Sequence, residues 1–251
     1  MNKVIIVIST LFVTSIILAS CGGNSQENKK QEVEINFDVI FSEDSTEITL
    51  GDQTWMTMNL NTMTFRNGDS IPIANSISDW EKASWRDTPL CGYYDNNPKN
   101  GEKYGMLYNW HAVTDERGLA PEGWQIPSDI AWTQLKNFLN NEEVAGHYLK
   151  STTDWVENGN GNNASGFNAL PCGWYSDMSN EYSGLGELTS WWSTKSGSTA
   201  ELAQDIAAWV WSVEFSDSTF SRGDFYKSNG FSVRCIKDSV SNERASLIIK
   251  K

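Results

Sequence analysis

Histidine is scarce in this sequence: its 251 residues include only His111 and His147. Hydrolytic triads and most zinc sites depend on histidine as a base or a metal ligand. Neither residue lies in a catalytic signature, and His111, next to Trp110, is expected to be a structural histidine. Motifs of the types His-Glu-x-x-His, Cys-x-x-Cys, Gly-x-x-x-x-Gly-Lys and Gly-x-Ser-x-Gly are absent. The sequence therefore gives no support for a zinc protease, a phosphate-binding loop or a hydrolase with a nucleophile elbow.

Basic residues are outnumbered, because 19 Lys and Arg stand against 32 Asp and Glu, for a formal net charge of −13. A nucleic-acid partner is not expected, since binding phosphates requires a basic surface. After the first twenty residues no apolar run approaches the roughly 20 residues of a membrane helix. The composition, 39% hydrophobic and 20% charged, is that of a folded domain rather than a disordered chain.

Residues 1–20 have the pattern of an export signal, with Lys3 before an apolar stretch from Val4 to Leu18. The stretch ends at Leu18-Ala19-Ser20-Cys21, which resembles the lipobox of bacterial lipoproteins. That resemblance implies cleavage before Cys21 and acylation of this cysteine. The alternatives are an ordinary cleavage site beside a cysteine, or an uncleaved helix. Acyl chains contribute about 0.8 kcal/mol per buried CH₂, so several chains would hold the protein on a lipid bilayer.

Residues 21–32 contain no apolar side chain after the anchor and predict a flexible tether of about 20 Å. If Cys21 is the anchor, the domain is expected in the cell envelope, outside the cytoplasm, where disulfides persist. Gly22 stands where an inner-membrane retention signal has aspartate, which favours the outer membrane. In residues 33–50, the alternation from Val33 to Phe41 predicts a lead-in strand, and a second strand is expected from Ile48 to Trp55.

Residues 51–238 form the predicted domain, and residues 239–251 a C-terminal tail. The clearest helix begins after Pro127, with Ser128 as its N-cap and Trp132, Leu135, Phe138 and Leu139 on one face, and should end near Asn140. Weaker helices are expected at 108–113 and 142–150, and a loop at 159–166. Two strands are expected at 210–215 and 231–236, separated by a polar turn around 221–224.

Six motifs stand in a recognisable order in this domain. They are Trp55-Met56-Thr57-Met58-Asn59-Leu60, Tyr104-Gly105-Met106-Leu107-Tyr108-Asn109-Trp110, Pro121-Glu122-Gly123-Trp124-Gln125-Ile126-Pro127-Ser128-Asp129, Gly166-Phe167-Asn168-Ala169-Leu170-Pro171, Trp191-Trp192-Ser193 and Ser232-Val233-Arg234-Cys235. Together they resemble the Fibrobacter succinogenes major paralogous domain. That family is similar in turn to the formylglycine-generating enzymes, which implies an α+β, C-type-lectin-like fold of short strands, few helices and long loops. The family has no established common reaction, so the resemblance implies little about activity.

The resemblance also bears on the cysteines. Family members commonly have cysteine where this chain has Ala120. Once Cys21 is acylated, Cys91, Cys172 and Cys235 remain, an odd number that allows one bridge and one free thiol. Cys91 and Cys235 lie near family cysteine positions, which implies a disulfide between them. Three buried thiols are the alternative.

Formylglycine-generating enzymes hold copper between two closely spaced cysteines, and this resemblance defines an alternative function. The corresponding stretch, residues 191–238, contains Cys235 alone, and one thiolate does not make the paired site that Cu(I) prefers. A degenerate or unrecognised oxidase is therefore the second choice. No cofactor or metal is expected. Calcium stays open, because Asp95 and residues 158–163 offer oxygen ligands but few charges.

Tryptophan is abundant, with 12 residues. Most should lie in the core, but Trp174-Tyr175 and Trp191-Trp192 flank a loop of Ser, Asn and Gly. Adjacent residues of a strand point to opposite faces, so at least one ring of each pair is expected to be exposed. Exposed rings suit ligand contact, although a structural role for all four stays open. The sequence thus predicts a non-catalytic, lectin-like envelope lipoprotein whose partner is a neutral glycan or another envelope protein.

Overall fold

The computed structural model describes residues 46–140 and 142–238. The predicted leader, tether, lead-in strand at 33–41 and C-terminal tail lie outside these residues. Within the described ranges, no helix has both the length and the apolar character needed to cross a membrane.

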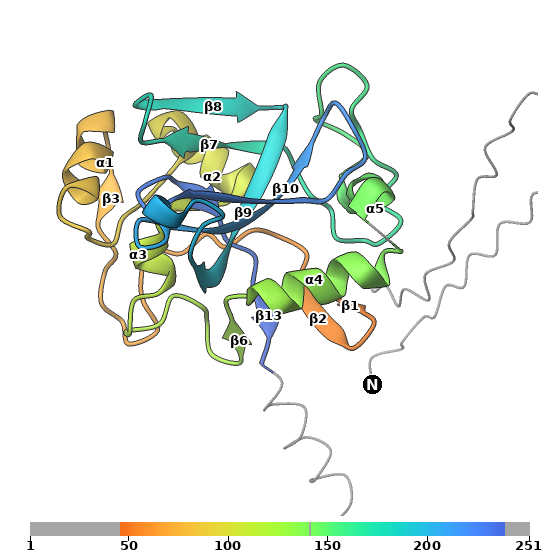
Figure 1. Cartoon of the computed structure of the whole chain (residues 1–251), viewed down its shortest axis with the longest axis horizontal. Helices are drawn as coiled ribbons and strands as arrows, with labels where there is room; N and C mark the ends of the chain where they lie inside the picture. Colours follow the sequence, from red (N-terminus) through yellow and green to blue (C-terminus); the bar gives the residue numbers. More distant parts are fainter. Residues whose placement is uncertain (1–45, 141, 239–251) are drawn as a thin grey trace, which may run out of the picture.

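Short strands form three sheets (Figure 1). The largest has seven strands in the order β11-β10-β9-β12-β5-β4-β3, the second has the order β1-β2-β13-β6, and β7 pairs with β8. The strand bounds are β1 Glu47–Leu50, β2 Gln53–Met56, β3 Ile73–Ala74, β4 Cys91–Gly92, β5 Leu107–Tyr108, β6 Trp124–Gln125, β7 Cys172–Ser176, β8 Glu181–Leu185, β9 Leu188–Ser196, β10 Ala207–Glu214, β11 Ser221–Tyr226, β12 Phe231–Ser232 and β13 Ile236–Lys237.

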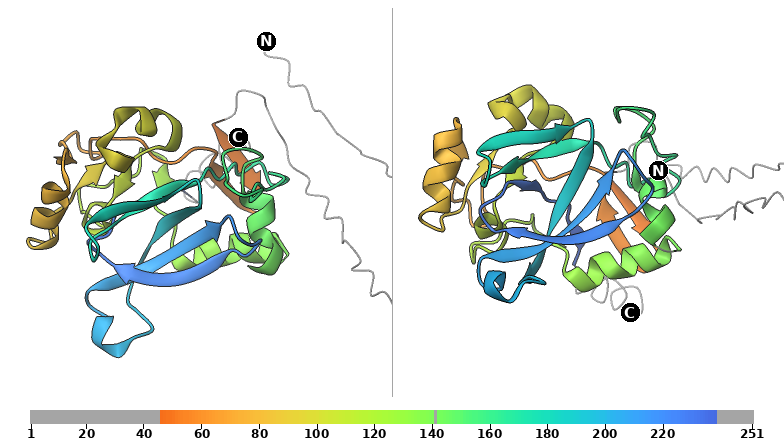
Figure 2. Two further views of the ribbon diagram at one scale, coloured as in Figure 1. Left: turned by 90° about the horizontal axis from the view of Figure 1, so that it is seen from above. Right: turned by 45° about the horizontal axis from the view of Figure 1, so that its top comes forward.

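Helices are few and short. They are α1 Ile77–Ser84, α2 Pro98–Tyr104, α3 Trp110–Val113, α4 Asp129–Phe138 and α5 Glu142–Leu149, with single 3₁₀ turns at Tyr94–Asn96 and Glu201–Ala203. The described chain is thus mixed α+β with several small sheets, as predicted. The α4 and α5 helices lie beside the β1–β2 hairpin at one end of the molecule, and α1 lies at the other end (Figures 1 and 2).

Helix α4 confirms the most local of the sequence predictions. The Ser128 backbone is extended, and its hydroxyl accepts a hydrogen bond from the Ala131 amide at 3.2 Å, which satisfies one free donor of the first turn. Trp132 and Leu135 are buried, as expected, but Phe138 is 39% exposed. The weaker helices correspond to α3 and α5, and residues 159–166 form no helix or strand, as predicted.

Three strand predictions need correction. The single strand expected from Ile48 to Trp55 is a hairpin, because Gly51 turns the chain at φ 60°. The strand expected at 231–236 is two strands: β12 pairs in the large sheet, whereas Ile236 of β13 pairs with Trp55 in the second sheet. The turn expected at 221–224 is part of strand β11, which lies at the sheet edge and pairs only with β10. An edge strand has polar residues on its solvent-facing side, and in the sequence such a polar segment resembles a turn.

The core is built on both faces of strand β9. Trp191 packs with Trp55, Trp132 and Phe167 in one apolar cluster. Trp192, the next residue, packs with Phe231 and belongs to a second cluster. Because adjacent strand residues point to opposite faces, both faces of this strand are covered by protein.

Candidate functional site

The four predicted ligand-binding aromatics are not an exposed surface. Trp191 and Trp192 are fully buried, which overturns the prediction that one ring of that pair is exposed. Their indole N–H groups donate to Asn59 Oδ1 at 2.9 Å and to the Tyr108 carbonyl at 2.7 Å. These two tryptophans are core residues, because clusters cover both faces of their strand.

The Trp174-Tyr175 pair divides between core and surface. Tyr175 is fully buried and stacks on Trp80 at 4.7 Å between ring centroids. Trp174 is half-buried and lies parallel to Phe231 at 5.1 Å, so only part of its ring reaches solvent. Of the four predicted residues, Trp174 alone retains accessible surface.

The predicted Cys91–Cys235 disulfide is not formed. Cys91, Cys172 and Cys235 are free and buried, which is the alternative that the sequence left open. Burial raises the pKa of the Cys91 and Cys235 thiols to about 12, and it also raises the pKa of Cys172. All three are protonated at neutral pH, and a thiol in that form is a poor nucleophile and a poor metal ligand.

A buried polar network lies at the centre of the molecule. The Asn59 Oδ1 atom accepts hydrogen bonds from Arg234 Nε at 3.0 Å, from Arg234 Nη2 at 2.8 Å and from Trp191 Nε1. Asn59 Nδ2 donates to the Tyr104 carbonyl at 3.0 Å, and Arg234 Nη1 donates to the Phe167 carbonyl. Arg234 is 1% exposed, and among the described residues no carboxylate contacts it. Neutral oxygens and aromatic faces therefore stabilise this cation.

The network brings together residues from most of the sequence motifs. Asn59, Tyr104, Phe167, Trp191 and Arg234 come from five of the six motifs, and they meet in one buried cluster. Desolvation lowers the pKa of Arg234 to about 9, so the guanidinium is still protonated at pH 7. These five motifs thus help to specify the core.

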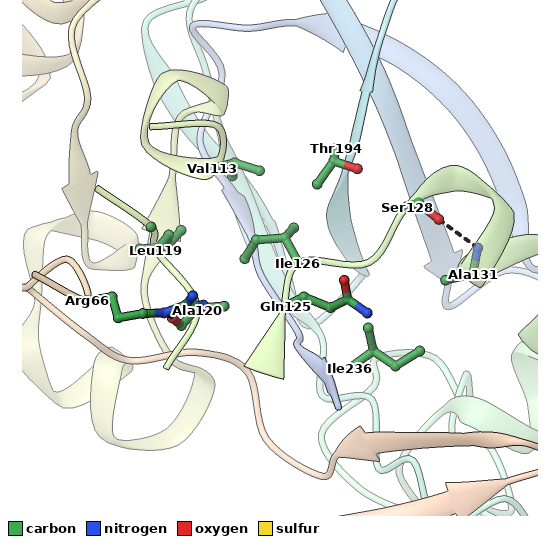
Figure 3. A pocket seen from close by; sticks show the side chains of 11 residues that line it. Arg66, Val113, Leu119, Ala120, Gln125, Ile126, Ser128, Ala131, Thr194 and Ile236 are labelled. Carbon is green, nitrogen blue, oxygen red and sulfur yellow. Dashed lines mark hydrogen bonds between the residues drawn. The ribbon is translucent and has the colours of Figure 1, made fainter. Parts of the chain in front are cut away.

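A concave surface runs along the start of α4. A pocket of about 310 Å³ lies between Arg66, strand β6, the end of β9 and the first turn of α4 (Figure 3). A second pocket of about 450 Å³ extends from there to the β1–β2 hairpin. Both are lined by Gln125, Ser128, Ala131 and Ile236, so they adjoin. We call the two pockets together the α4 groove.

Uncharged amides and hydroxyls dominate the polar lining of the α4 groove. The amide of Gln53 donates to the Ala131 carbonyl at 3.0 Å and to Gln134 Oε1 at 3.1 Å, which orients both glutamines. Of the three charged side chains in the lining, Asp52 is exposed, whereas Arg66 and Lys237 are engaged elsewhere. Arg66 donates to the carbonyls of Ala120 and Trp124, and Lys237 pairs with a glutamate of strand β1 at 2.7 Å.

Apolar side chains lie beside these amides. Ile130, Gln134 and Phe138 follow one another at intervals of four residues on α4, so they lie on one face of the helix, and all three line the groove. Ile130 is 70% exposed. Opposite Phe138, Gly51 has a positive φ, and a side chain there would come within 3.0 Å of the phenyl ring. Glycine at this position therefore keeps the ring accessible.

The polar lining of the groove consists mainly of amides and hydroxyls, with the exposed carboxylate of Asp52 among them. None of the described residues that line it is a histidine or a cysteine. In the described ranges, no group of three or more His, Cys, Asp and Glu is placed to hold a metal ion. Nothing in the sequence marks Gln53 and Gln134, which stand in no motif, and Gln125 lies in a family motif that does not by itself indicate a ligand site. The three glutamines line one groove only in the folded chain.

Comparison with known protein families identifies the domain. The profile of the Fibrobacter succinogenes major domain matches residues 48–237. The chain belongs to this family. No curated protein and no solved structure matches the chain. The Fibrobacter succinogenes major domain spans β1 to β13, so both the α4 groove and the Asn59 network belong to it.

Proposed function

We propose that this protein is a lipoprotein of the bacterial cell envelope, anchored through acylated Cys21, whose domain binds a neutral ligand in the α4 groove and carries out no catalysis. The observation that carries the proposal is the groove itself, with its oriented glutamines beside exposed apolar side chains. We place the anchor in the outer membrane, and we extend the proposal to a C-type-lectin-like fold.

A neutral glycan is the preferred ligand, and a segment of another envelope protein is the second choice. Amide groups donate and accept at once, which matches the paired hydroxyls of a sugar. Phe138 and Ile130 offer apolar surface for the C–H face of a sugar ring. The net charge of −13 disfavours an acidic ligand.

The oxidase alternative gains no support from the geometry. It requires two thiolates that approach each other closely, whereas Cys91 and Cys235 are buried thiols whose pKa is raised to about 12. A binding role is therefore the better proposal.

A glycan array tests the binding role. The intact chain, purified in mild detergent, should bind neutral glycans, and Gln53→Ala or Phe138→Ala should weaken binding about tenfold, as expected for the loss of one or two contacts. Asn137→Ala is the matched control, because Asn137 is exposed on the same helix but does not line the groove. Equal binding by all three variants would contradict the proposal. Arrays run with calcium and with chelator also test for a metal requirement.

Replacing Cys21 by Ser tests the anchor. In cells that are given labelled palmitate, the wild-type chain should incorporate the label and lose its leader. The Cys21→Ser variant should incorporate none and keep the leader, because the acylated side chain is missing. Equal labelling of the variant would show that the anchor is elsewhere.

A further inference from the structure

The most exposed large apolar side chain among the described residues lies at the C-terminal end of helix α1. Trp85, directly after the helix, is 89% exposed, whereas Trp80 in the same helix is fully buried. Two residues that are five positions apart on a helix differ in side-chain direction by about 140° around the helix axis. The indoles of Trp80 and Trp85 therefore point in different directions. Trp80 is fixed in the core by its bond to the Tyr182 hydroxyl at 2.9 Å. The same helix packing that buries Trp80 therefore directs Trp85 into solvent.

A fixed carboxylate lies beside Ser84, the residue directly before Trp85. Asp177 Oδ2 accepts hydrogen bonds from the Ser84 hydroxyl at 3.1 Å and from the Ser228 hydroxyl at 2.8 Å. The Asp177 amide donates to Asn229 Oδ1 at 2.9 Å, which holds the backbone as well. The other carboxylate oxygen, Oδ1, has no partner among the described residues. Ser84 directly precedes Trp85 in the chain, so the residue that bonds to this carboxylate is the backbone neighbour of the exposed indole.

We name this region, formed by Ser84, Trp85, Asp177, Met178 and Ser228, the Trp85 platform. Met178 is 76% exposed and extends the apolar surface. The residues that follow Trp85, from Arg86 to Thr88, are exposed and polar. The exposed indole offers one flat apolar face, and the carboxylate held by Ser84 offers a fixed hydrogen-bond acceptor. A single sugar ring has an apolar C–H face and hydroxyl donors that match these two groups.

We propose that the Trp85 platform binds one ring of a neutral saccharide. The apolar C–H face of the sugar lies on the indole, and a sugar hydroxyl donates to Asp177 Oδ1. The carboxylate repels acidic sugars, which restricts the ligand to uncharged ones. The platform lies at the α1 end of the molecule, away from the α4 groove (Figures 1 and 2). It is a second binding site and does not depend on the proposed role of the groove.

Titration with neutral oligosaccharides tests the platform. The intact chain that carries Gln53→Ala and Phe138→Ala serves as the background, so that binding in the α4 groove does not contribute. Gluco-, manno-, galacto- and xylo-tetraose are added in turn, and both tryptophan emission and heat are recorded. At least one of the four should shift the emission to shorter wavelength, because the sugar displaces water from Trp85.

Three variants in the same background identify the residues. Trp85→Ala should abolish the emission shift and weaken binding by about tenfold or more, and Asp177→Asn should weaken binding while keeping the shift. Trp85→Phe should restore part of the affinity, since a ring is present again. The urea midpoint of Trp85→Ala should equal that of the background, because the side chain is exposed. The proposal is overturned if none of the four sugars binds, or if Trp85→Ala binds as well as the background does.

Discussion

Replacing Asn59 by Ala is expected to lower the free energy of unfolding by about 3–5 kcal/mol, because several buried donors, two of them on a cation, lose their acceptor at about 1–3 kcal/mol each. One amide oxygen accepts two donors of Arg234 and the indole N–H of Trp191, all inside the core. Alanine leaves these donors without an acceptor and leaves the guanidinium without its main stabilising dipole. Urea unfolding followed by circular dichroism measures the loss.

Two further variants show whether the loss comes from the network. Asn67→Ala removes an exposed asparagine that bonds to an exposed aspartate, so its effect should stay within about 0.5 kcal/mol. In the second, Arg234→Met is added to Asn59→Ala, which removes the stranded cation. This double variant should be no less stable than the Asn59→Ala single variant. Additive losses would mean that the two residues do not act as a unit.

Local sequence signals predicted α4 well, because the signals and the structure lie within the same dozen residues. Ser128 caps the helix, and Trp132 and Leu135 fall on its buried face. The mixed α+β class and the family were also predictable, because the six motifs stand in order. Their residues meet in the Asn59 network only when the chain folds, so the sequence identified the motifs without showing that they share one cluster.

Predictions that depended on distant partners failed for a common physical reason. The strand period shows that Trp191 and Trp192 point in opposite directions, but it does not show how many faces of the sheet are covered. Here α4 and the first hairpin cover one face, and the cluster around Phe231 covers the other. The change of sheet between Ser232 and Ile236 is likewise set by the partners β5 and β2, which lie more than a hundred residues earlier.

The two proposed binding surfaces left unequal signals in the sequence. The glutamines of the α4 groove come from separate segments, and only Gln125 lies in a motif. Trp80 and Trp85, in contrast, are five residues apart, a spacing that does not put both on one face of a helix. That spacing predicts one buried and one exposed indole, once helix α1 is recognised. The helix was missed because it has only eight residues, of which Trp80 and Ala83 are buried.

Replacing Trp132 by Ala is expected to lower the free energy of unfolding by about 3–5 kcal/mol, the usual cost of removing a large buried aromatic side chain. The distances from its ring centroid to those of Trp55, Trp191 and Phe220 are 4.5, 5.7 and 6.0 Å. Trp132 therefore joins helix α4 to the four-stranded sheet through Trp55 and to the seven-stranded sheet through Trp191. Chemical denaturation followed by near-ultraviolet circular dichroism measures the loss.

Ile130→Ala is the matched control on the same helix, because Ile130 is 70% exposed and its stability effect should stay within about 0.5 kcal/mol. Comparing Ile130→Ala with Trp132→Ala also distinguishes an effect on stability from an effect on glycan binding. Ile130 lines the α4 groove, so its variant should weaken glycan binding at unchanged stability, whereas Trp132→Ala should lower stability by loosening the helix that forms the groove wall. Equal stability of the two variants would show that α4 is not held by the aromatic core.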